Sequence, residues 1–250
     1  MKNTPKVSFI IPVLYLQRPL NKKRFFMPRS TLQDILADIE NNVTIAYEVI
    51  VICNSNDPEL IDYVSTHKSI TKYVLNSVNP GVSRSWNIGA EMAEGEYLCY
   101  ASDDVRIGAG AIEALCGALD LESELAEVGP KGDLYVNGRP DRFVGLEVPE
   151  YSDVISGFLF LVRTSAYFQV GGFDIAYSPA GCEEVDFSFS LRKHGWKCKV
   201  IPNLDITHNE HHGVSAHRTE IEYLNSTIDT LDLHERNTRY FLSKWGYSDS

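Results

Sequence analysis

The chain has 250 residues, of which 44% are hydrophobic, and it carries a formal net charge of −11 at pH 7. This composition suffices for one substantial core, and no Pro/Gly/Ser-rich or charge-rich linker divides the sequence. The acidic balance argues against nucleic acid and against an electrostatically bound anionic membrane, although the local basic patch Lys22-Lys23-Arg24 could still meet a phosphate. The expected partner is a small molecule or a glycan.

The sequence also sets expectations about compartment. It shows no secretory leader and no apolar stretch long enough to span a bilayer, which predicts a cytoplasmic protein. The five cysteines form no Cys-x-x-Cys pair, so neither a disulfide framework nor a zinc knuckle is indicated.

In the first half, short apolar runs alternate with helical patterns. This alternation predicts an α/β fold with a mainly parallel sheet that helices cover on both faces. The strands are expected at Val7–Val13, Glu48–Cys53, Thr71–Leu75 and Glu96–Ala101. The helices are expected after a capping box at Ser30–Gln33, after Asp57-Pro58, over Ser83–Ala93 and over Gly108–Leu119.

The second half has a different pattern. Asp133–Arg139 contains an Asn-Gly turn and predicts a hairpin. Val154–Val162 predicts one strand, with a glycine where another group approaches the backbone closely. A helix over Glu183–His194 and a strand over Lys197–Ile201 follow, and polar, partly helical sequence is expected from Ser215 onward.

Polar residues follow several of these apolar runs. Asn54, the Asp103-Asp104 pair and His208 each come just after one, and ligands of open α/β sheets bind beyond the carboxyl ends of the strands. A divalent cation relieves the repulsion between two adjacent carboxylates. The alternative is that the two acids cap the helix expected over Gly108–Leu119.

Five stretches carry a resemblance to a known family. They read "VSFIIPV", "EVIVICNSND", "NPGVSRSWNIGAEMAEGEYLCYASDDV", "VGGFD" and "CEEVDFSFSLRKHGWKCKVIP". Their order and spacing over Val7–Ser215 resemble the inverting glycosyltransferases of family two, the nucleotide-sugar enzymes with the GT-A fold, such as bacterial rhamnosyl and polysaccharide glycosyltransferases. The resemblance implies a GT-A domain over residues 1–215, with a nucleotide-binding part to about 105 and an acceptor part after it, and a C-terminal helical extension over 216–250.

The resemblance implies a metal site that holds Mn2+ or Mg2+. Asp104 matches the acid that closes the family's Asp-x-Asp motif, and His208 matches a histidine that completes the metal or diphosphate site. Asp103, the middle residue, is expected at the ribose or in solvent. Ser102 stands where the family often has the first Asp, which leaves the site with less negative charge.

The same resemblance places the nucleotide. Pro12, Asn54, Asn79, Arg84 and Asn87 are its expected contacts. Asn79 and Arg84 lie at a turn into a helix, and a helix N-terminus suits a diphosphate. Asn54 stands where the family commonly has an acid that reads the base, and an Asx turn is the alternative. The neighbouring Trp86 is expected in the core.

The motif Cys182-Glu183-Glu184-Val185-Asp186 resembles the family's Glu-Asp-x-Asp, which carries the catalytic base. Inverting transfer needs a carboxylate that takes the proton from the attacking hydroxyl. Glu184 is the expected base, Glu183 is the second candidate, and Asp186 is expected to orient or support. Acids in a first helical turn also stabilise a helix whatever their function.

These observations predict transfer of a sugar from a nucleotide-diphosphate sugar to a hydroxyl of a glycan, a lipid-linked acceptor or another acceptor. The alternative is a catalytically silent GT-A module that binds nucleotide or glycan, which Cys53, Ser102 and Glu184 motivate as departures from the family pattern. The long segment Tyr15–Arg29 is expected over the donor site or against a phosphate-bearing acceptor, unless it is a plain surface loop. Peripheral membrane association stays open, and no nucleic-acid partner is expected.

Overall fold

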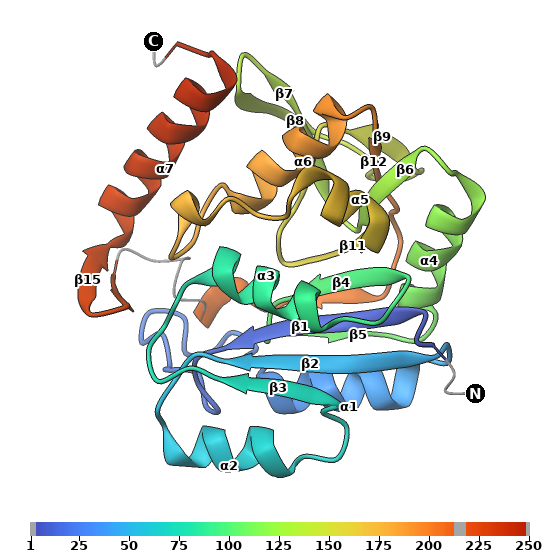
Figure 1. The fold of residues 1–250 in the computed structure, drawn as a ribbon. Helices are drawn as coiled ribbons and strands as arrows, with labels where there is room; N and C mark the ends of the chain where they lie inside the picture. The colour runs from blue at the N-terminus through green and yellow to red at the C-terminus, as the bar shows by residue number, and fades with distance from the viewer. Residues whose placement is uncertain (1–3, 213–218, 249–250) are drawn as a thin grey trace.

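The computed structural model describes residues 4–212 and 219–248, and its central element is an eight-stranded sheet (Figure 1). In spatial order its strands are β3 (Lys72–Leu75), β2 (Tyr47–Cys53), β1 (Val7–Val13), β4 (Tyr97–Ala101), β11 (Leu159–Arg163), β6 (Leu125–Gly129), β12 (Lys197–Val200) and β9 (Glu150–Ser152). The first four are parallel, and β11 runs antiparallel to both β4 and β6. The predicted α/β class with a mainly parallel sheet is confirmed.

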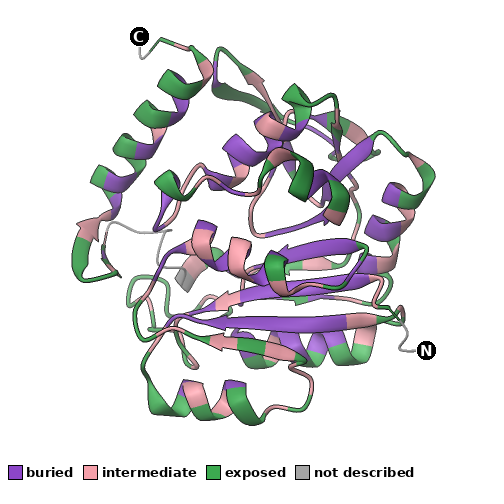
Figure 2. Cartoon of the chain, viewed as in Figure 1, coloured by how far each residue is buried: buried purple, intermediate pink, exposed green. Residues whose placement is uncertain are grey.

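Helices cover both faces of this sheet because its central strands bury side chains on both sides. Phe9 and Ile11 of β1 belong to one core and Ile10 belongs to the other. The first core is closed by α1 (Leu32–Asn42), α2 (Pro58–Thr66) and α4 (Ala111–Leu121), and the second by α3 (Val82–Met92), α5 (Thr164–Val170) and α6 (Glu183–Lys193). Figure 2 shows the resulting buried central layer between half-exposed helices.

Three smaller sheets and a final helix complete the described fold. The smaller sheets are β7 (Gly132–Val136) with β8 (Arg139–Phe143) and β10 (Val154–Ile155); β5 (Val105–Ile107) with β13 (Ile206–His208); and β14 (Glu220–Tyr223) with β15 (Ser226–Asp229). Two short 3-10 helices are η1 (Ile175–Tyr177) and η2 (Glu210–His212). The C-terminal helix α7 (Thr230–Trp245) packs through Phe241 and Leu242 against Val185 and Phe189 of α6. The proposed domain boundary at 215/216 lies outside the described residues.

Several predicted elements need correction. The capping box of α1 uses Thr31 and Asp34, because the Thr31 N–H and Oγ1 donate to Asp34 Oδ2 at 2.9 and 3.1 Å. The helix expected from Gly108 begins at Ala111, after the unpredicted strand β5. The single strand expected over Val154–Val162 is two strands, β10 and β11, because the chain passes from the three-stranded sheet to the central sheet around Gly157.

Other expectations are confirmed. Asp57 caps α2 by accepting from the Glu59 N–H at 3.0 Å, and the hairpin β7–β8 turns at Asn137 and Gly138 with φ of 51° and 74°. In the described part of the chain, no helix combines the length and apolar character needed to cross a bilayer.

Candidate active site

A cavity of about 670 Å³ opens beyond the carboxyl ends of β1, β2 and β4. Its other walls include the N-termini of α3 and α6, residues 156–158, β13 and the loop after β1, with Phe143 of β8, Ile221 of β14 and His234 of α7. Most of the residues expected to bind the nucleotide-sugar or the metal, or to act as the base, line this cavity. They are Pro12, Asn54, Asn79, Asp103, Asp104, Glu183, Glu184 and His208. The topology therefore gathers residues that are up to about 200 positions apart.

One side of the cavity carries Asp103 and Asp104. They lie in the short connection between β4 and β5 and are only 7% and 3% exposed. Because α4 begins at Ala111 with Gly110 as its N-cap, the helix-cap alternative for the two acids is wrong. Arg18, from the loop after β1, donates to both acids, with Nη1 2.7 Å from Asp104 Oδ2 and Nη2 on Asp103 Oδ1. Asp103 therefore does not face solvent.

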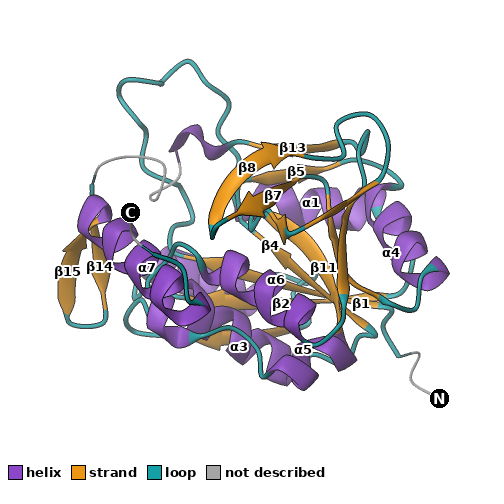
Figure 3. Cartoon of the chain, turned by 90° about the horizontal axis from the view of Figure 1, so that it is seen from above, coloured by secondary structure: helices purple, strands orange, loops and turns teal. Residues whose placement is uncertain are grey.

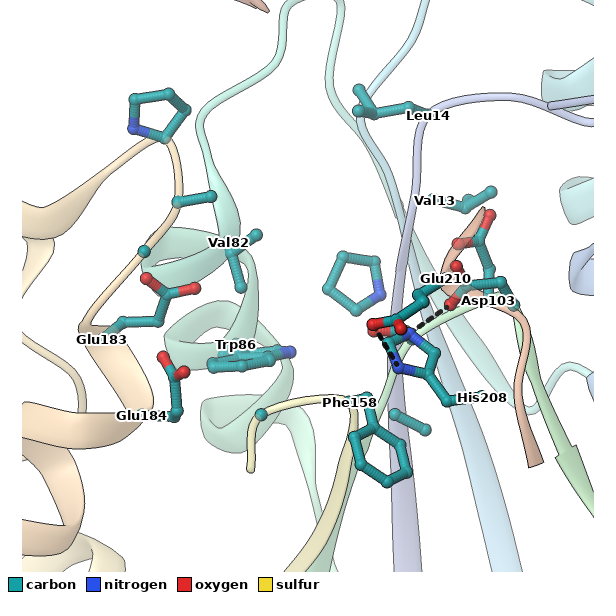
Figure 4. A pocket seen from close by; sticks show the side chains of 18 of the residues that line it. Val13, Leu14, Val82, Trp86, Asp103, Phe158, Glu183, Glu184, His208 and Glu210 are labelled. Carbon is teal, nitrogen blue, oxygen red and sulfur yellow. Dashed lines mark ion pairs between the residues drawn. The ribbon is translucent and has the colours of Figure 1, made fainter. Parts of the chain in front are cut away.

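His208 joins this acidic pair through strand pairing. Strand β13 runs antiparallel to β5 with His208 opposite Val105, which is the residue after Asp104. Its Nε2 lies 3.3 Å from Asp104 Oδ1, and its ring stacks on Phe158 at a centroid distance of 4.6 Å and an interplanar angle of 9°. Asp104 and His208, both expected at a metal site, therefore lie next to each other, and Figure 4 shows His208 and Asp103 on the same side of the cavity.

Burial and charge act differently on the two acids. Burial raises the pKa of Asp103 to about 6, although the Arg18 guanidinium opposes this shift. Burial also raises the pKa of Asp104, but the His208 imidazole and Arg18 together outweigh it, so the net shift is downward. Asp104 is consequently the acid that stays ionised most readily.

Asp104 and His208 offer atoms that suit a divalent cation. Asp104 Oδ1 is buried and makes no hydrogen bond of normal geometry within the described residues, while it faces His208 Nε2. A carboxylate oxygen and an imidazole nitrogen suit Mn2+. The described residues contain no group of three or more His, Cys, Asp or Glu arranged to hold a metal. With the described residues alone, a cation at Asp104 and His208 would therefore need further ligands, such as water or substrate oxygens.

The opposite side of the cavity carries Glu183 and Glu184 (Figure 4). Both belong to the first turn of α6, whose N-cap Cys182 has a φ of 70°. Glu183 is 6% exposed and its Oε2 has no hydrogen-bond partner in the described structure. Burial, with the neighbouring Glu184 carboxylate, raises the pKa of Glu183 well above its usual range, and burial also raises the pKa of Glu184.

Gly157 lines the cavity and leaves room for the side chain of Glu184. A Cβ atom at this position would lie 3.1 Å from Glu184 Cγ and 3.3 Å from its Cβ. The close approach predicted at this glycine is therefore present, and the group that approaches is the Glu184 side chain.

Asp186 has a different position from the two glutamates. It is 2% exposed and does not line the cavity. Its Oδ1 accepts from Trp245 Nε1 at 2.8 Å and Tyr177 Oη at 3.1 Å, and its Oδ2 accepts from Lys244 Nζ at 2.8 Å. Asp186 thus attaches α7 to α6, which agrees with a supporting role.

Arg84 and Asn87 also lie outside the cavity lining. The Arg84 guanidinium donates to Tyr223 Oη of β14. Asn87 joins α3 to the Gly171–Asp174 turn: its Oδ1 accepts from Tyr167 Oη at 2.7 Å and from the Phe173 N–H at 2.9 Å, and its Nδ2 donates to the Phe173 carbonyl at 2.8 Å. In this structure, Asn87 holds α3 and this turn together.

The other predicted nucleotide contacts line the cavity, but some of their hydrogen-bonding atoms are already paired within the protein. Asn54 Nδ2 donates to Ser85 Oγ at 2.8 Å, and its Oδ1 accepts from Asn76 Nδ2 at 3.0 Å. This amide network replaces the Asx turn considered for Asn54. Asn79 Oδ1 accepts from the Gly81 N–H at 2.9 Å and holds the turn into α3. Trp86 is 3% exposed and packs with Tyr100, Phe160 and Phe173, as expected of a core residue.

Arg18 is the site residue that sequence reasoning missed. The segment Tyr15–Arg29 was expected over the donor site, and its residues Tyr15 and Arg18 do line the cavity. This segment contains five cationic residues and no acidic residue. That composition was a signal that one of the cations could pair with the two acids that follow the strand Tyr97–Ala101.

The fold is an α/β architecture of the GT-A type. Two solved structures share it: GalNAc-T7 with UDP, GalNAc and Mn2+ (TM-score 0.64, 16% identity, 83% of this chain and 44% of that one), and the mannosyltransferase PcManGT from Pyrobaculum calidifontis in complex with GDP-Man and Mn2+ (TM-score 0.63, 14% identity, 86% and 60%). At these identities the likeness concerns the fold.

The sequence comparisons are more specific. The family model described as glycosyl transferase family 2 matches residues 25–134. Curated relatives from two strains of Mycobacterium tuberculosis, each an N-acetylglucosaminyl-diphospho-decaprenol L-rhamnosyltransferase, are 28% identical over 179 residues, which cover 59% of this chain. The alignment covers 55% of the relatives, so it spans about half their length. The resemblance to glycosyltransferase family 2 is confirmed.

Proposed function

We propose that this protein is an inverting glycosyltransferase that moves a sugar from a nucleotide-diphosphate sugar to a hydroxyl group, with the cytoplasm as the expected compartment. The observation that carries the proposal is one cavity with two acidic sides. Asp104 and His208 lie on one side, and the raised-pKa carboxyls Glu183 and Glu184 lie on the other. A leaving diphosphate and an attacking hydroxyl need these two kinds of group at opposite ends of the reacting sugar.

The diphosphate end is assigned to Asp104 and His208. These two residues would hold Mn2+ or Mg2+, together with oxygens of the donor diphosphate. When bound, the cation would supply Lewis-acid stabilisation of the negative charge on the leaving group. Arg18 already lies against the acids and lines the cavity, so its guanidinium is within reach of the same phosphates once it leaves Asp103.

The acceptor end is assigned to Glu184. Its carboxyl lines the cavity beside Gly157, and burial raises its pKa, which makes it a stronger base for the proton of a hydroxyl. Glu183 is the second candidate, because its buried Oε2 has no partner in the described structure. The neighbouring Glu184 carboxylate adds to burial in raising the pKa of Glu183.

The first experiment identifies the donor. Thermal-shift measurements with UDP-, GDP-, dTDP- and CMP-sugars, each with and without Mn2+, should show one selective stabilisation, because a ligand that binds the folded state raises its melting temperature. With that donor, Asp104→Ala and Glu184→Gln should each abolish transfer while the protein stays folded. Asp62→Asn, an exposed acid on α2, is the matched control. Near-normal turnover in either site variant would refute its assigned role.

The inverting outcome is tested on the product. Proton NMR of the new glycosidic linkage should show the anomeric configuration opposite to that of the donor. A retained configuration would exclude Glu184 as a base that acts in a single displacement.

The second candidate is a catalytically silent module that binds nucleotide or glycan. Ser102 in place of an acid, with Arg18 paired to both Asp103 and Asp104, is the observation that favours it. A donor-hydrolysis assay with manganese separates the two candidates, because a silent module would saturate with nucleotide and release no free sugar.

A further inference from the structure

The connection between β1 and α1 exposes aromatic and basic side chains together. Phe25 and Phe26 are 68% and 71% exposed, and Leu20 is 51% exposed. The rings of the two phenylalanines contact each other edge to face at a centroid distance of 5.7 Å. Exposure of two adjacent large rings is unfavourable in water, which marks this tip as a contact surface.

The charge of the same segment is opposite to that of the chain. Residues 15–29 contain five cationic side chains and no acidic one, although the net charge of the protein is −11. Lys22, Lys23 and Arg24 directly precede the two phenylalanines and are exposed. Aromatic rings beside a cluster of Lys and Arg are the combination that binds anionic bilayers: the rings enter the headgroup region and the cations neutralise lipid charge.

Hydrogen bonds hold the connection in place, two of them to His211 and one within the connection itself. Asn21 Nδ2 donates to the His211 carbonyl at 3.1 Å, Arg24 Nη1 lies 2.8 Å from His211 Nδ1, and Arg29 Nη1 donates to the Arg18 carbonyl at 2.9 Å. Figure 3 shows this connection projecting beyond the body of the molecule on the side of β13. A projecting, braced tip can enter a bilayer surface without rearrangement of the fold.

We propose that the tip formed by Leu20–Met27 docks the protein on an anionic lipid bilayer. The first residues of the same connection, Leu14, Tyr15 and Arg18, line the cavity, so a docked bilayer lies beside the cavity wall. If the proposed transfer holds, on which this step rests, the acceptor hydroxyl belongs to a lipid-anchored molecule in that bilayer. The overall acidic charge would then keep the rest of the surface away from the membrane.

Vesicle co-sedimentation tests the docking without any donor. Wild-type protein should sediment with phosphatidylglycerol-containing vesicles, far less with pure phosphatidylcholine vesicles, and less as salt is raised, because the attraction is screened. Phe25→Ser with Phe26→Ser, and separately Lys22→Glu with Lys23→Glu, should each reduce the bound fraction at least tenfold. The control is Tyr73→Ser with Leu121→Ser, which removes two exposed apolar side chains elsewhere.

The outcomes are distinct. Equal sedimentation of wild type and the Phe25/Phe26 variant, or no binding to anionic vesicles, would overturn the docking. Sedimentation-velocity runs that show self-association lost in this variant would overturn it in favour of a second copy of the chain as the partner. Donor binding measured without vesicles reports on the proposed function alone, so either proposal can fail while the other stands.

Discussion

The pairing of Arg18 with Asp103 and Asp104 makes a quantitative prediction about cation binding. The side chains of Arg18, Asp103 and Asp104 are 12%, 9% and 4% exposed, so these ion pairs are largely removed from water. Removal of one partner from such a buried pair costs about 3–5 kcal/mol, because a charge is left unpaired. Arg18→Gln should therefore lower the free energy of unfolding by about 3 kcal/mol in metal-free buffer, which is roughly 6–12 °C in Tm for a chain of this size.

The same variant should bind Mn2+ more tightly. In the wild type, a cation bound at Asp104 would compete with the positive charge of Arg18, whereas in Arg18→Gln the acids would be free to bind it. We expect the dissociation constant for Mn2+ to fall at least tenfold, which corresponds to about 1.4 kcal/mol, and added Mn2+ to restore most of the lost Tm. Isothermal titration calorimetry on chelator-treated protein measures this, and Lys22→Gln is the control for loss of a cation from the same loop.

Two results would contradict this reasoning. An unchanged or weaker affinity for Mn2+ in Arg18→Gln would show that Arg18 does not compete for the acids. An unchanged Tm in metal-free buffer would show that the ion pairs are not formed in solution.

Three further predictions concern neighbouring parts of the fold. Burial raises the pKa of Glu127 to about 8, from 4.5 in the unfolded chain. Between these two pH values the unfolded chain has lost the proton and the folded protein has kept it, so the free energy of unfolding falls as pH rises. At pH 8, urea unfolding should therefore show Glu127→Gln to be more stable than the wild type by a few kcal/mol. A stability difference that stays constant from pH 5 to 8 would contradict this. Gly157→Ala should displace Glu184 and lower kcat with donor affinity unchanged, and equal loss of both would point to general disruption. Asp186→Asn should weaken the contact with Lys244 and cost about 2 kcal/mol in unfolding free energy, whereas wild-type stability would show that α7 is held by its apolar contacts alone.

The fold was predictable mainly where one strand or one cap determines the local structure. Strand β1 begins and ends at the predicted residues because a continuous apolar run is typical of a strand buried on both faces. The Asp57-Pro58 start of α2 was found because both residues act locally. In contrast, β6 was missed, because the buried acid Glu127 interrupts its apolar pattern. Glu127 accepts a hydrogen bond of 2.7 Å from Ser188 Oγ, a partner far along the chain that the local pattern does not indicate.

The site was predictable as a set of strand ends but not as a set of contacts. The resemblance correctly gathered Asp104, His208 and Glu184 around one cavity. It could not reveal Arg18, because the pairing joins positions more than eighty residues apart through a loop without periodicity. It also assigned Arg84 and Asn87 to the nucleotide; in the structure both lie outside the cavity lining, and their assignment stays a prediction.

The contacts of Asp186 with Lys244 and Trp245 affect how mutational data on this protein should be interpreted. Glu183, Glu184 and Asp186 occupy the same turn, and loss of activity is expected when any of them is replaced, but for different reasons. An inactive variant by itself therefore cannot identify the base. Identification requires a variant that is inactive and still retains the wild-type melting temperature, and among these three acids Asp186 is the one expected to fail that criterion.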